Sequence, residues 1–174
     1  DDVADHTLKM LRGAMAECRM GNPGRLTTDI GPVIDAEAKA NIENHIQAMR
    51  AKGRPVFQAV RDNSEDAREW RSGTFVPPTL IELASFDELK KEVFGPVLHV
   101  VRYNRNNLNE LVEQINASGY GLTLGVHTRI DETIAQVTGS AKVGNLYVNR
   151  NMVGAVVGVQ PFGGEGLSGT GPKA

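Results

Sequence analysis

Short apolar runs and stretches of helical periodicity alternate along most of this chain, and no other feature constrains the fold as much. Runs rich in Val, Ile and Leu that are bounded by turn residues are typical of buried strands. Strands that alternate with helices favour right-handed β-α-β units with helices on the faces of the sheet. We therefore expect an α/β fold, a mostly parallel sheet with flanking helices. Its strands are expected at residues 55–60, 74–83, 96–103, 122–127 and 144–149.

Helices are predicted where apolar residues recur at spacings of three and four. The first ends at the Gly-Asn-Pro-Gly turn of 21–24, and the second runs between Pro32 and Gly53. A capping-box sequence at 85–88 predicts a short helix, and Asp131 is expected to cap the last one. The residues expected to face inward are Leu8, Leu11, Met15 and Cys18 in the first helix, Ala38, Ile42, Ile46 and Met49 in the second, Leu108, Leu111, Val112 and Ile115 in the fourth, and Ile134, Val137 and Ala141 in the last.

Composition limits the class of protein. The 174 residues, of which 40% are hydrophobic, suffice for one domain with a real core. With a net charge of −2 and dispersed arginines, we expect no nucleic-acid binding by this segment and no attraction to an anionic membrane. No apolar run approaches the length of about 20 residues that a membrane span needs.

The single cysteine rules out an internal disulfide and points to a reducing compartment, so we expect a cytoplasmic protein. The four histidines lack the spacing of metal ligands, so no metal is expected. The chain begins with Asp1 rather than Met, and its last residues, 172–174, have the composition of a loop. We expect it to be a piece of a longer polypeptide.

A glycine string near the end of the chain matches the dinucleotide-binding pattern G-x-G-x-x-G over residues 164–169. That loop needs a strand before it, a helix after it and an acidic residue about 20 positions further on. Here Pro161 comes shortly before the string, and no helical periodicity follows it. The context therefore argues against a phosphate loop and favours a glycine-rich turn.

Four motifs, in this order and at these separations, resemble the C-terminal part of the aldehyde dehydrogenase superfamily. The resemblance covers essentially all 174 residues, with further matches at 21–23 and 31–33. It implies the C-terminal part of an aldehyde dehydrogenase catalytic domain. The motifs are Glu92-Val93-Phe94-Gly95-Pro96-Val97, Asn116 with Tyr120-Gly121-Leu122, Gly144-Asn145-Leu146-Tyr147-Val148-Asn149, and Pro161-Phe162-Gly163-Gly164 with Ser168-Gly169.

A narrower resemblance lies in the segment Val153-Gly154-Ala155-Val156-Val157-Gly158-Val159-Gln160-Pro161-Phe162, which is similar to the substrate loop of L-glutamate γ-semialdehyde dehydrogenases. Together with residues 119–128 and 149–151, it resembles the dehydrogenase region of bifunctional proline-utilization proteins of bacteria. The resemblance implies oxidation of Δ1-pyrroline-5-carboxylate to glutamate with NAD, in proline catabolism. It also implies that FAD belongs only to a proline dehydrogenase domain elsewhere in the parent chain.

The resemblance implies two cofactor-binding residues. Glu92 matches the glutamate that binds the hydroxyls of the nicotinamide ribose, and a carboxylate can accept hydrogen bonds from two vicinal hydroxyls. Phe94 would lie against the nicotinamide. The alternative is that Glu92 is a surface charge at a helix end and Phe94 a core residue.

Three substrate-binding residues are implied as well. Gly154 and Ala155 would present backbone N–H groups to the carboxylate of the aldehyde, because small side chains let an anion approach the backbone. Ala155 departs from the family, which often places serine there. Phe162 would pack against the aliphatic part of the substrate. The alternative is a plain apolar loop. We therefore divide the chain into a catalytic-domain fragment, 1–149, and a glycine-rich aldehyde-anchor region, 150–174, of the same domain.

The catalytic nucleophile of these enzymes is a cysteine thiolate. Cys18 shares an apolar helical stripe and is expected to be a buried, inert thiol, so no catalytic residue is assigned to this segment. The nucleophile and the main NAD domain are expected upstream of Asp1, and the isolated chain is expected to be inactive. Asn149 is expected to brace the active-site loop through its amide.

Two other functions stay open. One is an aldehyde dehydrogenase of different substrate specificity, and the other is a non-catalytic scaffold or interaction module. The expected partners are the aldehyde substrate and the rest of the parent chain, which is expected to form a homo-oligomer. No membrane partner is expected.

Overall fold

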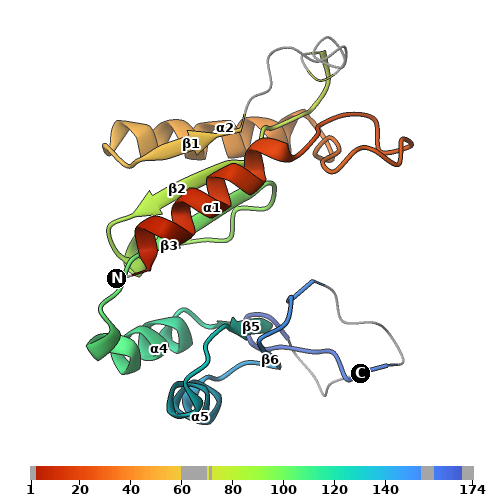
Figure 1. Ribbon diagram of the computed structural model, residues 1–174. Coiled ribbons are helices and arrows are strands. Elements are labelled where there is room, and N and C mark those ends of the chain that lie inside the picture. Colours follow the sequence, from red (N-terminus) through yellow and green to blue (C-terminus); the bar gives the residue numbers. More distant parts are fainter. Residues whose placement is uncertain (1–2, 60–69, 71, 154–158, 170–174) are drawn as a thin grey trace. The chain divides into compact units, whose positions relative to one another are not determined.

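A computed structural model describes residues 3–59, 70, 72–153 and 159–169, and these form two compact units (Figure 1). The first unit spans residues 1–102 and the second residues 103–174. The predicted division at 149/150 is a functional one that falls inside the second unit, and it stays a prediction.

The first unit is built on a three-stranded sheet of β1 (Val56–Gln58), β2 (Thr79–Leu83) and β3 (Val97–Val101), in that order. The central strand β2 pairs antiparallel with β1 and parallel with β3. It is also the most buried strand, because helices pack on both of its faces. These are α1 (Ala4–Glu17) and α2 (Ala36–Ala51).

Successive side chains of β2 point to opposite faces of the sheet, and their contacts show which helix covers which face. Ile81 and Leu83 belong to the core cluster that contains the buried residues of α2. Glu82 lies between them in sequence and therefore points to the opposite face, where it binds Arg12 of α1. Figure 1 shows α1 running across β2 and β3. The residues that form the buried core on the α2 side are Ile42, Ile46, Met49, Val76, Ile81 and Leu83.

The periodicity of the second helix is confirmed. Asp35 caps α2 by accepting a hydrogen bond from the N–H of Ala38 at 2.7 Å. The buried residues of α2 are Ile42, Ile46 and Met49, three of the four expected; Ala38 is half-buried. The helix ends shortly before Gly53, whose φ of 74° is a conformation that favours glycine.

The capping-box expectation at 85–88 is wrong in its details. The segment forms only a single 3₁₀ turn, η1 (Phe86–Glu88), and the side chain of Ser85 makes no cap hydrogen bond. Glu88 reaches instead to the N–H of Ala84 at 2.8 Å and to the Nε of Arg54 at 2.9 Å. The acidic side chain therefore ties this turn to the residues after α2 rather than extending a helix.

The described residues of the second unit, 103–153 and 159–169, form two short sheets and two helices. After the 3₁₀ turn η2 (Arg105–Asn107) come α4 (Leu108–Ala117), β4 (Tyr120–Gly121), β5 (Thr123–Val126), α5 (Asp131–Ser140), β6 (Asn145–Val148) and β7 (Glu165–Gly166). Strand β5 pairs parallel with β6, and β4 pairs antiparallel with β7. Asp131 is the first residue of α5 and makes no cap, because the N-cap position belongs to Ile130.

The α/β fold is confirmed, and the two longer ladders, β2–β3 and β5–β6, are parallel. Strand β7 was not expected, because two exposed residues in a glycine-rich stretch carry no strand periodicity. Among the described helices, none has the length and apolarity that crossing a membrane requires.

Cys18 corrects one expectation. It lies at the C-cap of α1 and is half-buried rather than buried, because the chain leaves the helix at this residue. Its Sγ donates to the carbonyl oxygen of Ala14 at 3.6 Å.

Candidate functional site

The glycine string packs against the loop and strand that follow α4. The N–H of Leu167 donates to the carbonyl oxygen of Gly119 at 2.7 Å. The Oγ of Ser168 accepts a hydrogen bond from the N–H of Gly121 at 3.1 Å. Together with the β4–β7 ladder, these bonds fold residues 165–168 onto β4 as a tight turn.

Close backbone packing explains why glycine occupies the first and last positions of the string. A Cβ on Gly164 would lie 2.6 Å from the carbonyl oxygen of Ser168. A Cβ on Gly169 would lie 2.6 Å from the carbonyl oxygen of Gly164. The two glycines therefore close the turn against each other, which supports a structural role rather than a phosphate-binding one.

The segment before the string is held by β6. Asn145 and Tyr147 lie on the same face of this strand, and both are buried, with 8% of each residue exposed. The amide Nδ2 of Asn145 donates to the carbonyl oxygens of Gly163, at 3.1 Å, and Leu122, at 3.4 Å. The hydroxyl of Tyr147 accepts a hydrogen bond from Nε2 of Gln160.

Phe162, the predicted substrate contact, lies between these two attachments and is 42% exposed. Phe162 is therefore not a fully buried core residue, although the side chain of Gln160 before it and the carbonyl of Gly163 after it are both bonded to β6. The other two predicted substrate-binding residues, Gly154 and Ala155, lie outside the residues that the structure describes. The guanidinium of Arg150 lies 4.6 Å from the ring centroid of Tyr147, a cation–π distance.

The amide of Asn149 bonds to the residues after β5, and its expected bracing of the active-site loop stays a prediction. Its Nδ2 donates to the carbonyl oxygen of Thr128 at 2.9 Å, and its Oδ1 accepts from the N–H of Thr128 at 3.0 Å. Asn149 has a φ of 53°, a left-handed conformation that asparagine tolerates better than most residues. The paired bonds tie the end of β6 to the residues after β5.

The two predicted cofactor-binding residues lie in the loop between η1 and β3 of the first unit. Glu92 is exposed, and Phe94 is 82% exposed, so Phe94 is not a core residue within this unit. Gly95 follows with a φ of 148°, and its Cα packs so closely on the side chain of Ile42 that a Cβ would collide with it. The loop therefore presents an acidic and an aromatic side chain next to a backbone anchored on α2.

Two polar clusters of the first unit escaped the sequence analysis. Glu82 joins three elements: its Oε1 lies 2.6 Å from Nη2 of Arg12, and its Oε2 lies 3.2 Å from Nη2 of Arg102. Hydrogen bonds to Asp5 and Glu82 raise the pKa of Arg102. The packing of α1 on the sheet and the register of β2 with β3 bring these residues together, although they are far apart in sequence.

The second cluster is a pair of histidines, one from α2 and one from β3. The Nε2 atoms of His45 and His99 lie 2.8 Å apart, and the two rings meet edge to face. Burial lowers the pKa of both, and the charges of Lys52 and Lys91 lower that of His45 further. Among the described residues, no three His, Cys, Asp or Glu side chains lie together as metal ligands would.

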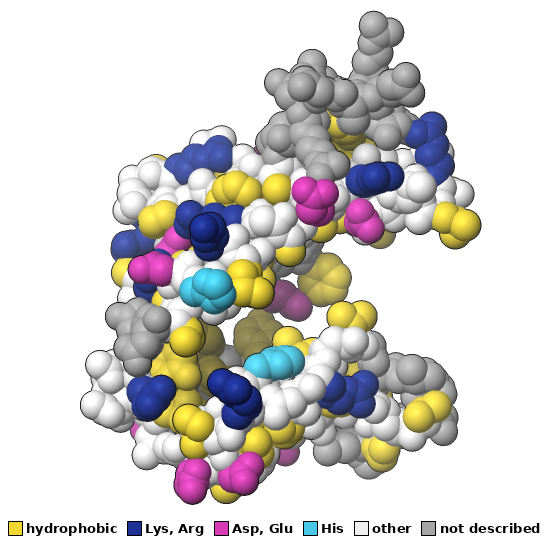
Figure 2. Space-filling view, in the orientation of Figure 1, with side chains coloured by type: hydrophobic (Ala, Val, Ile, Leu, Met, Phe, Trp, Pro, Cys, Tyr) yellow, Lys and Arg dark blue, Asp and Glu magenta, His cyan; other side chains and the backbone are white. Residues whose placement is uncertain are grey.

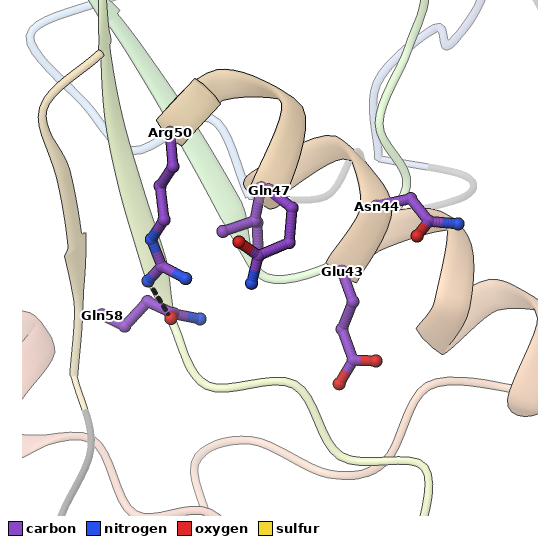
Figure 3. A pocket seen from close by; sticks show the side chains of 6 residues that line it. Glu43, Asn44, Gln47, Arg50 and Gln58 are labelled. Atoms are coloured by element: carbon purple, nitrogen blue, oxygen red, sulfur yellow. Dashed lines mark hydrogen bonds between the residues drawn. The ribbon is translucent and has the colours of Figure 1, made fainter. Parts of the chain in front are cut away.

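One polar cavity of about 320 Å³ opens on the side of α2 that faces β1, and no predicted site residue lines it. Arg50 reaches across from α2 to the side chain of Gln58, while Glu43 and Gln47 extend from the same helix (Figure 3). On the face drawn in Figure 2, Lys and Arg side chains are scattered among acidic and apolar ones and form no continuous basic patch.

This chain is similar to known proteins over its whole length. A family model described as the aldehyde dehydrogenase family matches residues 1–174. The chain is 92% identical over 174 residues to the bifunctional protein PutA of Klebsiella aerogenes. The aligned residues make up 100% of this chain and 13% of that protein. It is 36% identical over 177 residues to 1-pyrroline-5-carboxylate dehydrogenase 1 of Halalkalibacterium halodurans. The aligned residues make up 99% of this chain and 32% of that protein.

Solved structures are similar to this chain as well. A mutant proline utilization A of Bradyrhizobium japonicum matches with a TM-score of 0.90 and 50% identity, covering 100% of this chain and 17% of that one. A betaine aldehyde dehydrogenase of Staphylococcus aureus, solved in complex with NAD⁺, matches with a TM-score of 0.81 and 26% identity, covering 99% of this chain and 34% of that one. The chain thus spans only a small part of the proteins it resembles.

Proposed function

Since this chain belongs to the aldehyde dehydrogenase family, we propose that it forms part of the catalytic domain of an NAD-dependent L-glutamate γ-semialdehyde dehydrogenase. The enzyme would oxidise Δ1-pyrroline-5-carboxylate to glutamate in proline catabolism. The observation that carries this proposal is a half-exposed Phe162 on a segment held at both ends by β6. The similarity to PutA and to 1-pyrroline-5-carboxylate dehydrogenases supports this choice of substrate.

The loop at 92–95 fits the cofactor end of such a site. When bound, NAD accepts a hydride from the substrate. The exposed carboxylate of Glu92 can accept hydrogen bonds from two vicinal ribose hydroxyls, and the exposed ring of Phe94 offers an apolar surface to a nicotinamide. A Cβ on Gly95 would collide with Ile42, so the backbone of this loop lies close against α2.

The segment around 154–162 would hold the aldehyde. Backbone N–H groups of Gly154 and Ala155 would bind the substrate carboxylate, and Phe162 would contact its aliphatic chain. The nucleophilic cysteine and the main NAD domain would lie in sequence that precedes Asp1 in the parent protein. The one cysteine here, Cys18, lies at the end of α1 with its thiol bonded to Ala14. The 174 residues alone are therefore proposed to be inactive.

The proposal places the parent enzyme in the cytoplasm as a homo-oligomer, with FAD confined to a proline dehydrogenase domain outside this segment. The cytoplasmic assignment rests on the use of a single cysteine without a disulfide.

Steady-state kinetics of the full-length parent test the substrate. We expect a kcat/KM for pyrroline-5-carboxylate well above that for unbranched aliphatic aldehydes. Equal values would favour an aldehyde dehydrogenase of other specificity, and no NADH formation with any aldehyde would favour a non-catalytic scaffold. A parallel assay of the isolated 174 residues is expected to give no NADH, and turnover there would refute the assignment of the nucleophile.

A further inference from the structure

Two buried polar side chains of β6 hold the chain on either side of Phe162. We propose that Asn145 and Tyr147 are positioning residues for the aldehyde, acting by fixing the place of the Phe162 ring. This inference rests on the function proposed above and deepens it, since it names what sets the affinity for the aliphatic part of the substrate.

The attachment after Phe162 is the amide of Asn145. It lies in a position that a strand would normally fill with an apolar residue, and only 8% of it is exposed. A buried amide is tolerated where its hydrogen bonds are made. The Nδ2 donates to the carbonyl oxygen of Gly163, the residue that follows Phe162, and also to that of Leu122, the residue just before β5. The side chain thus joins the loop directly to the parallel β5–β6 ladder.

The attachment before Phe162 is the hydroxyl of Tyr147. Its ring is buried, and the hydroxyl accepts a hydrogen bond from Gln160, two residues before Phe162. Arg150 stacks on the same ring and restrains it further. Because the strand repeat is two residues, Asn145 and Tyr147 project from the same face of β6, and their contacts fall on the two sides of Phe162.

The consequence for Phe162 is geometric. The side chain two residues before it and the backbone carbonyl one residue after it are bonded to β6, while the Phe162 residue stays 42% exposed. The ring is therefore held where a ligand can contact it, and binding loses less conformational entropy than it would if the loop had to become ordered. Neither attaching side chain needs to touch the substrate.

Kinetics of the full-length parent test this. Tyr147→Phe removes only the hydroxyl, and Asn145→Asp keeps the shape but replaces the donor with an acceptor. Each is expected to raise KM for pyrroline-5-carboxylate about 3- to 10-fold, the range that one lost hydrogen bond allows, while KM for NAD stays within twofold, roughly. KM for propanal, which is too short to need the Phe162 contact, is expected to stay unchanged.

Rescue and control variants separate positioning from general loss of structure. Gln160→Leu should raise KM for pyrroline-5-carboxylate as Tyr147→Phe does. Gln160→Glu should keep the wild-type KM, because the tyrosine hydroxyl can donate to a carboxylate. The matched control is Asn116→Ala, which removes an amide that also bonds two backbone groups, those of Ser140 and Lys142, at 2.9 and 2.8 Å. It is expected to leave KM for pyrroline-5-carboxylate unchanged.

A double-mutant cycle decides whether the effect passes through Phe162. In a Phe162→Ala background, Tyr147→Phe and Asn145→Asp are expected to have no further effect on KM. Additive effects, or equal increases of KM for all three substrates, would overturn the positioning role while leaving the proposed function intact. If the wild-type parent does not oxidise pyrroline-5-carboxylate, the proposed function itself fails. If Phe162→Ala leaves KM unchanged, the substrate contact and the positioning role both fail.

Discussion

The Nε2 atoms of His45 on α2 and His99 on β3 lie 2.8 Å apart, so the Nε2–H of one imidazole donates a hydrogen bond to the unprotonated Nε2 of the other. The pair links the helix to a strand of the sheet beneath it. The contact depends on at least one ring being uncharged, and burial together with two nearby lysines favours the neutral forms.

This pair predicts a loss of stability in acid. Both pKa values are lowered from the usual 6.5, so the unfolded chain binds more protons than the folded one as the pH falls through that value. The pair's contribution is present above about pH 6.5 and is lost as the pH falls toward the lowered folded values. Urea unfolding of the chain should therefore show a lower midpoint at about pH 5 than at about pH 8.

The double variant His45→Gln with His99→Gln tests the assignment. It is expected to lose less stability than the wild type over the same pH change. The control His6→Gln, which removes an exposed imidazole from α1, is expected to keep the wild-type loss. An unchanged pH dependence in the double variant would contradict the role of the pair.

The ion pairs of Glu82 predict a second effect on stability. Glu82→Gln removes the charge that two arginines share, and it is expected to lower the urea midpoint. Asp5→Asn removes a carboxylate that is 91% exposed and paired with Arg102, and it is expected to change the midpoint much less. Adding salt should reduce both differences, since screening weakens ion pairs. Equal midpoints for Glu82→Gln and the wild type would contradict this.

The glycine turn predicts that Gly164→Ala is destabilising. The new Cβ would lie 2.6 Å from a backbone oxygen and 2.8 Å from the Cβ of Ser168, neither of which can move cheaply. We expect a loss of about 1–3 kcal/mol, the usual cost of overpacking. Gly139→Ala in α5 is the control, because a Cβ there meets nothing within 4 Å; it should be neutral or stabilise by up to about 1 kcal/mol.

The cofactor assignment predicts a change in KM for NAD in the full-length parent. Glu92→Gln weakens two charge-assisted hydrogen bonds and is expected to raise this KM about tenfold or more, with KM for the aldehyde little changed. Phe94→Ala should act in the same direction. The control Lys90→Gln changes an exposed charge in the same loop and should leave both constants unchanged. If the Glu92 and Phe94 variants both keep the wild-type KM for NAD, the assignment of these two residues to the cofactor site is contradicted.

Much of the fold could be predicted from local sequence. The stripe of Ile42, Ile46 and Met49 predicted α2 and its buried face, because a 3.6-residue period puts these residues on one side. The glycine string was correctly predicted to be a turn, since neither the strand before nor the helix after a phosphate loop was indicated. The capping box at 85–88 misled, because Arg54, distant in sequence, attracts Glu88.

The sequence by itself determined the family and the α/β class, since motif order and hydrophobic periodicity are properties of the chain; the site residues it suggested stay a proposal. Only the tertiary structure decided which polar groups meet. The contacts of Glu82 with Arg12, of His45 with His99, and of Asn145 with Gly163 join residues that are 18 to 70 positions apart. Such contacts depend on strand register and helix packing, and local periodicity carries no information about either.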